Sequence, residues 1–195
     1  MISMKEMVVE NRSYRSFDPT VRVSEDELYE MIDCARLSPS GINKQPLRYR
    51  TVTDEKEKSG INGATRLGGL LPDLKLPPVG HEPPAYIVIC RDAEIAASDE
   101  KCAIDTGIAA EVILLTAVSL GLGGCLIGAF SREKIKAILA LPDGIEPMLL
   151  VAIGKPDETS VITVANSKTE TKYFRDSHNI HYVPKLPLGD VIIKK

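Results

Sequence analysis

One stretch of the chain limits the fold more than any other. Between Asp105 and Leu120, apolar and small residues would occupy almost every face of a helix. Its small residues would let a second helix approach closely: Gly107, Ala109, Ala110 and Ala117. The longest apolar run, from Ile108 to Leu122, is interrupted by Glu111 and is too short to span a bilayer. We therefore predict a core helix that is the most buried element of the fold, and no membrane association.

The composition indicates one compact domain that acts on small molecules. A chain of 195 residues that is 44% hydrophobic can bury a sizeable core, so we expect a single domain over residues 1–195, with 155–195 as a C-terminal arm. The net charge is only −3, which provides no field to attract nucleic acid or an anionic membrane. The first residues lack the pattern of a secretory signal, so we expect a cytoplasmic location.

The cysteines and histidines do not suggest a metal centre. The four cysteines lie far apart without a C-x-x-C pair: Cys34, Cys90, Cys102 and Cys125. We expect free, buried thiols rather than disulfides. His178 and His181 form an H-x-x-H pair, but His81 is the only other histidine and no ordered carboxylate set accompanies them. A zinc site is therefore not expected.

Local patterns predict several helices and strands. The S-x-x-E capping box occurs at residues 3–6 and 24–27, which predicts a short helix that stops before Asn11 and an amphipathic helix that ends near Leu37. Apolar, β-rich runs predict three strands: 48–53, 85–90 and 148–153. A further helix should begin after Ser131 and end by Pro142. Residues 60–82 are rich in Gly and Pro, and could form a lid, an interface loop or a shortened helical excursion.

Two polar segments could bind a phosphorylated ligand. Arg12, Ser13 and Arg15 could clamp an anion, because guanidinium groups bind phosphate through charge-assisted hydrogen bonds. The segment 38–46 adds Pro39, Ser40, Asn43 and Gln45, whose polar groups could contact a heterocycle or a sugar chain. The alternatives are a solvated arginine pair and an ordinary turn.

The glycine-rich stretch 121–128 is a weaker indication of a dinucleotide site. Leu126 occupies the place where G-x-G-x-x-G requires its last glycine, and the stretch ends a predicted helix instead of following a strand. These glycines are therefore expected to end the helix and to permit close packing.

Taken together, these segments resemble the nitroreductase family of flavoproteins. Residues 11–17 resemble its N-terminal R-S-x-R signature, residues 38–46 its P-S-x-x-N-x-Q-P segment, and residues 126–130 its flavin-edge segment. The resemblance implies an α+β fold, a mainly antiparallel sheet flanked by helices, in an intertwined homodimer with FMN at the interface. It also implies that the backbone N–H of Gly128 faces N5 of the flavin, although a purely packing role for this glycine remains open.

The resemblance extends to the C-terminus, where residues 182–192 resemble a closing segment that sends a basic residue to the flavin phosphate. Lys185 is the candidate, and an ordinary surface lysine is the alternative. The expected cofactor-binding residues are Arg12, Ser13, Arg15, Pro39, Ser40, Asn43, Gln45, Ile127, Gly128 and Lys185. No protein side chain is expected to be catalytic, because the flavin carries the chemistry.

The activity implied is a two-step (ping-pong) transfer of electrons. NADH or NADPH reduces FMN, leaves, and is replaced by a small organic acceptor such as a nitroaromatic or a quinone. Leu47 stands where family members often have an aromatic residue, and the central helical excursion is truncated. A dehalogenase, an enoate reductase, a flavin-fragmenting enzyme or a non-enzymatic flavin-binding protein therefore stay open as alternatives, as does the physiological acceptor.

Overall fold

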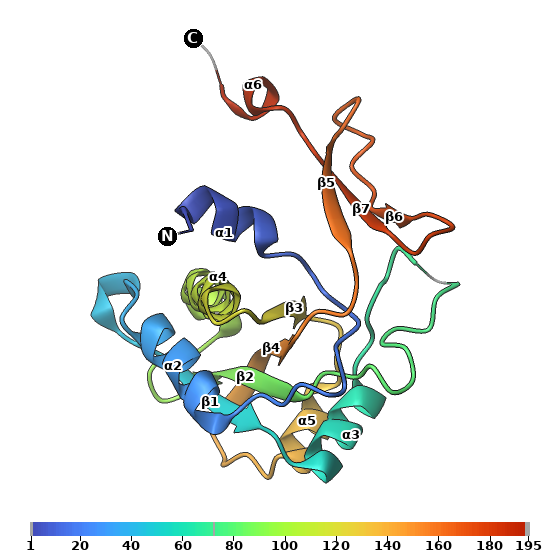
Figure 1. Cartoon of the computed structure of the whole chain (residues 1–195). Coiled ribbons are helices and arrows are strands. Elements are labelled where there is room, and N and C mark those ends of the chain that lie inside the picture. Colours follow the sequence, from blue (N-terminus) through green and yellow to red (C-terminus); the bar gives the residue numbers. More distant parts are fainter. Residues whose placement is uncertain (1, 72, 194–195) are drawn as a thin grey trace.

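The computed structural model describes residues 2–71 and 73–193 and has an α+β fold (Figure 1). Its centre is a four-stranded, fully antiparallel sheet in the order β1-β2-β4-β3. The strands are β1 (Leu47–Val52), β2 (Ala85–Asp92), β3 (Gly123–Ile127) and β4 (Ile145–Gly154). The three strands predicted from the sequence correspond to β1, β2 and β4. The expected fold class, a mainly antiparallel sheet flanked by helices, is confirmed.

Helices cover both faces of this sheet. One face is covered by α2 (Glu25–Arg36) and α4 (Ala103–Ser119), and the other by α3 (Glu55–Ala64) and α5 (Arg132–Ile138). Alternate residues of β2 serve the two cores: Ile87 and Ile89 pack with α2 and α4, whereas Tyr86 and Val88 pack with α3 and α5. The sheet therefore has no solvated face.

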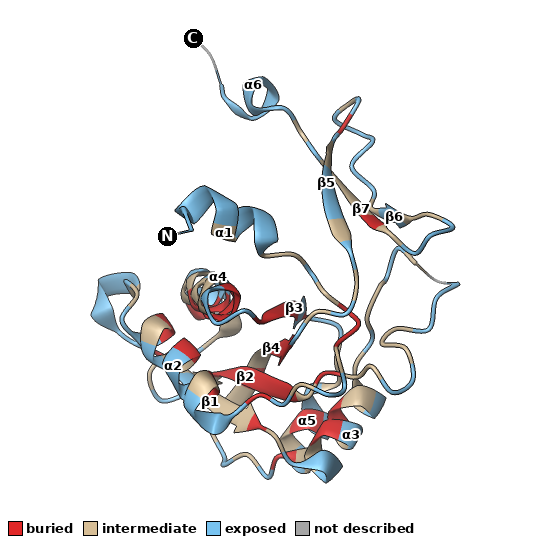
Figure 2. Cartoon of the chain, in the orientation of Figure 1, coloured by how far each residue is buried: buried red, intermediate tan, exposed pale blue. Residues whose placement is uncertain are grey.

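The structure corrects the expectation that the helix near residues 105–120 is the most buried element. Strand β2 is buried at six consecutive residues, whereas α4 leaves one face uncovered (Figure 2). Ile104 on that face is 78% exposed. By length and composition alone, the helical stretch 99–119 could cross a membrane. In this fold, α4 packs one of its faces against the sheet. The sequence overstated the burial of α4, because a helix with apolar residues on every face gives no sign of which face will lack a packing partner.

Both predicted capping boxes are present. The hydroxyls of Ser3 and Ser24 each accept a hydrogen bond from a backbone N–H, and the backbone N–H of each serine donates to the carboxylate of the glutamate three residues later. They begin α1 (Met4–Glu10) and α2, which end where the sequence predicts. Helix α5 also follows its predicted cap, Ser131. Two short 3-10 helices complete the main body: η1 (Gly41–Asn43) and η2 (Asp99–Cys102).

The glycines after α4 have the structural roles expected of them. Gly121 has a left-handed φ of 74° and ends the helix, and β3 follows directly. All four cysteines are free, and Cys90, Cys102 and Cys125 are buried as predicted, whereas Cys34 is only half-buried. Burial raises the pKa of the Cys90 thiol to about 12.

Beyond β4 the chain forms an arm that extends away from the main body (Figure 1). Its elements are β5 (Ser160–Val164), β6 (Phe174–Arg175), β7 (His181–Lys185) and α6 (Leu188–Val191). Strand β7 lies between β5, which is parallel to it, and β6, which is antiparallel. Apolar side chains remain exposed near the end of the arm: Leu188, Val191, Ile192 and Ile193.

Candidate functional site

The segment that contains the two arginines lies along the edge of the sheet. Ser13 forms a parallel bridge with Gly124 of β3, and the N–H of Tyr14 donates to the carbonyl of Gly124 over 3.0 Å. The close packing of Tyr14 against β3 depends on the neighbouring glycine, because a Cβ at position 123 would lie 2.8 Å from the Tyr14 ring. The sheet thus fixes where Arg12, Ser13 and Arg15 lie.

These three residues line a cavity of about 270 Å³ together with Lys185 of the arm. The structure therefore brings together the two arginines and the lysine that the sequence predicts at a phosphate. One carboxylate, Glu111 of α4, also lines the cavity, so three cationic side chains face one anionic side chain. This charge balance favours an anionic ligand.

Arg15 is held tightly within this cavity wall and is 8% exposed. Its Nη1 donates to the carbonyl of Ser13 over 3.1 Å, and its guanidinium lies 5.0 Å from the centre of the Tyr173 ring. Nη1 also lies 3.4 Å from Nε2 of His181. Because a guanidinium only donates, this imidazole nitrogen must accept, and His181 is neutral.

Glu158 and Arg175 form a buried ion pair next to Arg15 and His181. Burial, Arg15 and Arg175 lower the pKa of His181 to about 4. The carboxylate of Glu158 accepts hydrogen bonds from the backbone N–H of Arg15 and from the guanidinium of Arg175. The side chains of Arg175 and Glu158 are 6% and 1% exposed. This cluster joins the arm to the N-terminal segment.

Arg12 has unused hydrogen-bonding capacity. Its Nη2 donates to the carbonyl of Val8 over 2.7 Å. Its Nε is buried and finds no acceptor among the residues that the structure describes. Burial lowers the pKa of this guanidinium, against the attraction of Glu111. A buried N–H without a partner is costly, so this atom is suited to meet a ligand oxygen.

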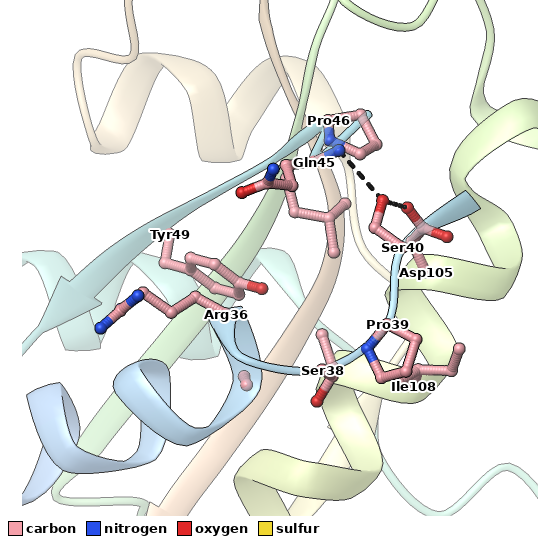
Figure 3. Close-up of a pocket in the computed structure, with 12 residues that line it drawn as sticks. Arg36, Ser38, Pro39, Ser40, Gln45, Pro46, Tyr49, Asp105 and Ile108 are labelled. Atoms are coloured by element: carbon pink, nitrogen blue, oxygen red, sulfur yellow. Dashed lines mark hydrogen bonds between the residues drawn. The ribbon is translucent and has the colours of Figure 1, made fainter. Parts of the chain in front are cut away.

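The second predicted segment lines a different, smaller cavity of about 60 Å³ (Figure 3). Pro39, Ser40 and Gln45 lie in its wall, between α2, β1 and α4. The side-chain amide of Gln45 donates to the backbone carbonyl and to the side-chain oxygen of Asn43, at 3.3 and 3.2 Å. The Ser40 hydroxyl donates to Asp105 and accepts from the Gln45 N–H, so it is engaged within the protein.

Within one chain the two predicted halves of the site lie apart. The cavities share no lining residue, and in the view of Figure 1 helix α4 lies between the segment 11–16 and the loop 37–46. Within one chain, the two halves therefore do not form a single cavity.

The predicted flavin edge follows β3. The Ile127 side chain is 2% exposed and packs in the core with α3 and α5, so only its backbone is free to meet a cofactor. Gly128 is exposed, and a Cβ there would meet nothing within 4 Å. The residues after it pair with the start of the segment 65–84: the N–H of Arg66 donates to the carbonyl of Ala129 over 2.9 Å.

That segment also reaches the arginine cavity. The N–H of Leu70 donates to the Tyr173 hydroxyl over 3.2 Å, and the Tyr173 ring lies beside Arg15 and 5.1 Å from the His181 ring. Sequence reasoning missed Tyr173 and His181 as members of the site. No pattern in the sequence marked Tyr173, and His181 was considered only as part of an H-x-x-H pair for zinc. The described residues contain no group of three or more potential metal ligands.

Comparisons with known proteins agree with the resemblance seen in the sequence. The Nitroreductase family model matches residues 8–155. The FMN reductase (NAD(P)H) of Bacillus subtilis is 30% identical over 173 residues, which cover 78% of this chain and 66% of that protein. The solved FMN-dependent nitroreductase of Clostridium difficile is 26% identical with a TM-score of 0.65, over 80% of this chain and 88% of that one. A solved nitroreductase family protein of Streptococcus pneumoniae, 17% identical, shares the fold over 99% of this chain and 100% of its own, with a TM-score of 0.70.

Proposed function

The chain belongs to the nitroreductase family, and from that premise we propose that it is an NAD(P)H-dependent oxidoreductase that uses FMN. Electrons pass from the nicotinamide to a small organic acceptor, such as a nitroaromatic or a quinone, in two separate steps. The relatives named FMN reductase (NAD(P)H) and FMN-dependent nitroreductase support this choice of cofactor and reductant.

The observation that carries the proposal is the cavity at residues 12–15. Three cationic side chains, those of Arg12, Arg15 and Lys185, face one carboxylate, and Arg12 Nε is buried without an acceptor among the described residues. A terminal phosphate supplies both the negative charge and the oxygen acceptors that this wall lacks. The residues present therefore fit an FMN phosphate.

The remaining half of the cofactor site comes from a second copy of the chain. The loop that contains Asn43 and Gln45 lines a separate cavity, and the face of α4 around Ile104 is exposed and apolar. The exposed apolar residues 191–193 at the end of the arm likewise require a surface to cover them. A homodimer would bury these surfaces and would join the two halves.

When bound, FMN supplies the redox chemistry, accepting hydride from the nicotinamide and delivering electrons to the acceptor. The protein binds the phosphate through Arg12, Arg15 and Lys185 and positions the polar groups of the cofactor through the amides of Asn43 and Gln45. Gly128 is exposed, and its backbone N–H would stabilise negative charge at the reactive edge without a titrating side chain. The four free cysteines are consistent with a reducing compartment, so we place the protein in the cytoplasm.

Replacement of Arg12 by alanine tests the phosphate site. The loss of a charge-assisted hydrogen bond should weaken FMN binding by about 10- to 150-fold, measured by fluorescence titration of the apoprotein. Arg22→Ala is the matched control, because Arg22 is 77% exposed and pairs with Glu55 away from both cavities. Equal FMN affinity in both variants would refute the phosphate assignment.

Two further measurements test the reaction and the assembly. Addition of NADH or NADPH to the FMN-loaded protein should bleach the oxidised flavin band, and bleaching should reverse when a nitroaromatic or a quinone is added. A flavin that neither nicotinamide reduces would favour a non-enzymatic flavin-binding protein. Light scattering should give about twice 21.2 kDa, and an FMN-saturated monomer would contradict the composite site.

A further inference from the structure

The loop between Ser40 and Gln45 has an unusual backbone. Ile42, Asn43 and Gln45 have left-handed φ angles of 46°, 57° and 51°. Such angles are costly for residues other than glycine, particularly for the β-branched Ile42, and persist only where the surroundings determine them. Ile42 is 88% exposed, so its own side chain has little packing to hold the loop in this shape.

Asp105, in the first turn of α4, binds the start of this loop with both of its carboxylate oxygens, and Figure 3 shows its contact with Ser40. The Ser40 hydroxyl donates to Oδ2 over 2.6 Å, and the N–H of Gly41 donates to Oδ1 over 3.2 Å. The Ser40 oxygen in turn accepts from the N–H of Gln45 over 3.0 Å. One carboxylate on a packed helix therefore holds both ends of the left-handed stretch.

We infer that Asp105 is a positioning residue for the cofactor site, acting through Ser40 to hold the loop that presents the amides of Asn43 and Gln45. This inference rests on the proposed function, because the loop has this task only if FMN binds there. It changes the role predicted for Ser40. With its hydroxyl engaged on both sides, Ser40 organises the loop instead of contacting the cofactor.

A different role for Asp105 would be stabilisation of α4 alone, since an acidic residue in the first turn interacts favourably with the helix dipole. The two roles differ in what they affect. A helix-stabilising residue changes the free energy of unfolding but leaves the affinity of the folded protein for FMN unaltered. A positioning residue changes that affinity and also the protection of loop amides in the apoprotein.

The test compares Asp105→Ala, Asp105→Asn and Ser40→Ala in the full-length protein. Glu100→Ala is the control, because it removes an exposed carboxylate from η2, directly before α4. FMN affinity is measured by fluorescence titration of apoprotein at a temperature where each variant is folded. Asp105→Ala should weaken binding by about 10- to 100-fold, and Asp105→Asn by less, because the asparagine oxygen still accepts from Gly41.

Hydrogen exchange of the apoprotein gives a readout independent of FMN. The amides of Gly41 and Gln45 should exchange about tenfold faster or more in Asp105→Ala, and at the wild-type rate in Glu100→Ala. If Asp105→Ala does not fold, Asp105→Asn and Ser40→Ala serve as the test. Wild-type exchange rates at both amides in a folded variant would overturn the inference.

A double-mutant cycle separates the two roles of Ser40. If Ser40 acts through the loop that Asp105 holds, the variant carrying both alanines should bind FMN about as weakly as Asp105→Ala alone. Additive losses would instead mean that Ser40 contacts FMN directly and would overturn the inference. A wild-type protein that binds no FMN would refute the proposed function, and the exchange rates would then decide the role of Asp105 in the loop.

Discussion

Replacement of Glu158 by glutamine should strongly destabilise the protein, although this residue lies in a short connection between β4 and β5. Its carboxylate side chain is 1% exposed and pairs with Arg175, which is 6% exposed. It also accepts from the backbone N–H of Arg15. Glutamine has almost the same shape, so the substitution removes the charge while it leaves the packing nearly unchanged.

The expected magnitude follows from burial. The removal of one partner of a buried ion pair leaves an uncompensated charge and costs about 3–5 kcal/mol. Arg15 and Arg175 both lie close enough to His181 to lower its pKa, and His181 is neutral, so no side chain named in this cluster other than Glu158 neutralises the two arginines. Glutamine keeps one oxygen as an acceptor, so the loss in the free energy of unfolding should be about 3 kcal/mol, the lower end of this range. With an m value of about 2 kcal/mol/M, the midpoint of urea unfolding should fall by about 1.5 M.

The matched control is Asp33→Asn, which also converts a carboxylate to an amide. Asp33 pairs with Arg36 over 2.6 Å, but these side chains are 52% and 59% exposed, so the loss should stay below about 1 kcal/mol. All curves are recorded at one protein concentration without added FMN, because dimerisation and ligand binding shift apparent stability. The reasoning fails if Glu158→Gln and Asp33→Asn have the same midpoint. Arg175→Met in the Glu158→Gln background should recover part of the loss.

Two further predictions concern the site. Gly124→Ala should lower the free energy of unfolding by about 2 kcal/mol or more in thermal or urea unfolding, because the new Cβ would lie 2.2 Å from the Ala152 carbonyl oxygen. Gly128→Ala is the control, and should change stability by about 0.5 kcal/mol at most, because a Cβ there would meet nothing within 4 Å. Equal losses in the two variants would contradict this prediction. Because the pKa of His181 falls from 6.5 to about 4 on folding, the unfolded chain takes up the proton first, and stability should decline by up to about 3 kcal/mol as the pH falls from 6.5 to 4. His181→Gln should flatten this slope in urea titrations, and parallel profiles would disprove a buried neutral imidazole.

Local sequence patterns predicted most of the main body correctly, because capping and periodicity are determined by neighbouring residues. Two elements of the main body were not predicted, strand β3 and helix α3. Asp54 caps it by accepting from the N–H groups of Lys56 and Glu57, a signal that the sequence does contain. Gly60 and Gly63 concealed the helix. Gly60 allows close packing, since a Cβ there would come within 3.2 Å of Ile138 in α5.

The resemblance to nitroreductases, based on residues 11–17, 38–46 and 126–130, is confirmed by the family match. The assembly of the site was less accessible to sequence reasoning. Lys185 and His181 reach the arginine cavity because β7 pairs with β5, and Glu158 joins that arm to Arg15. These contacts link residues far apart in the chain, for which a local pattern carries no signal. Asp105 was likewise considered only as part of a core helix.

The pairing of the N-terminal segment with β3 has a consequence for handling the protein. Strand β3 is at the edge of the sheet, and Ser13 and Tyr14 lie against it at Gly124. An edge strand without such a cover can pair with other molecules and promote aggregation. Truncations or fusions that loosen residues 11–16 should therefore reduce soluble yield. Loss of colour in such preparations would then reflect precipitation as well as weaker cofactor binding, so the soluble fraction should be quantified first.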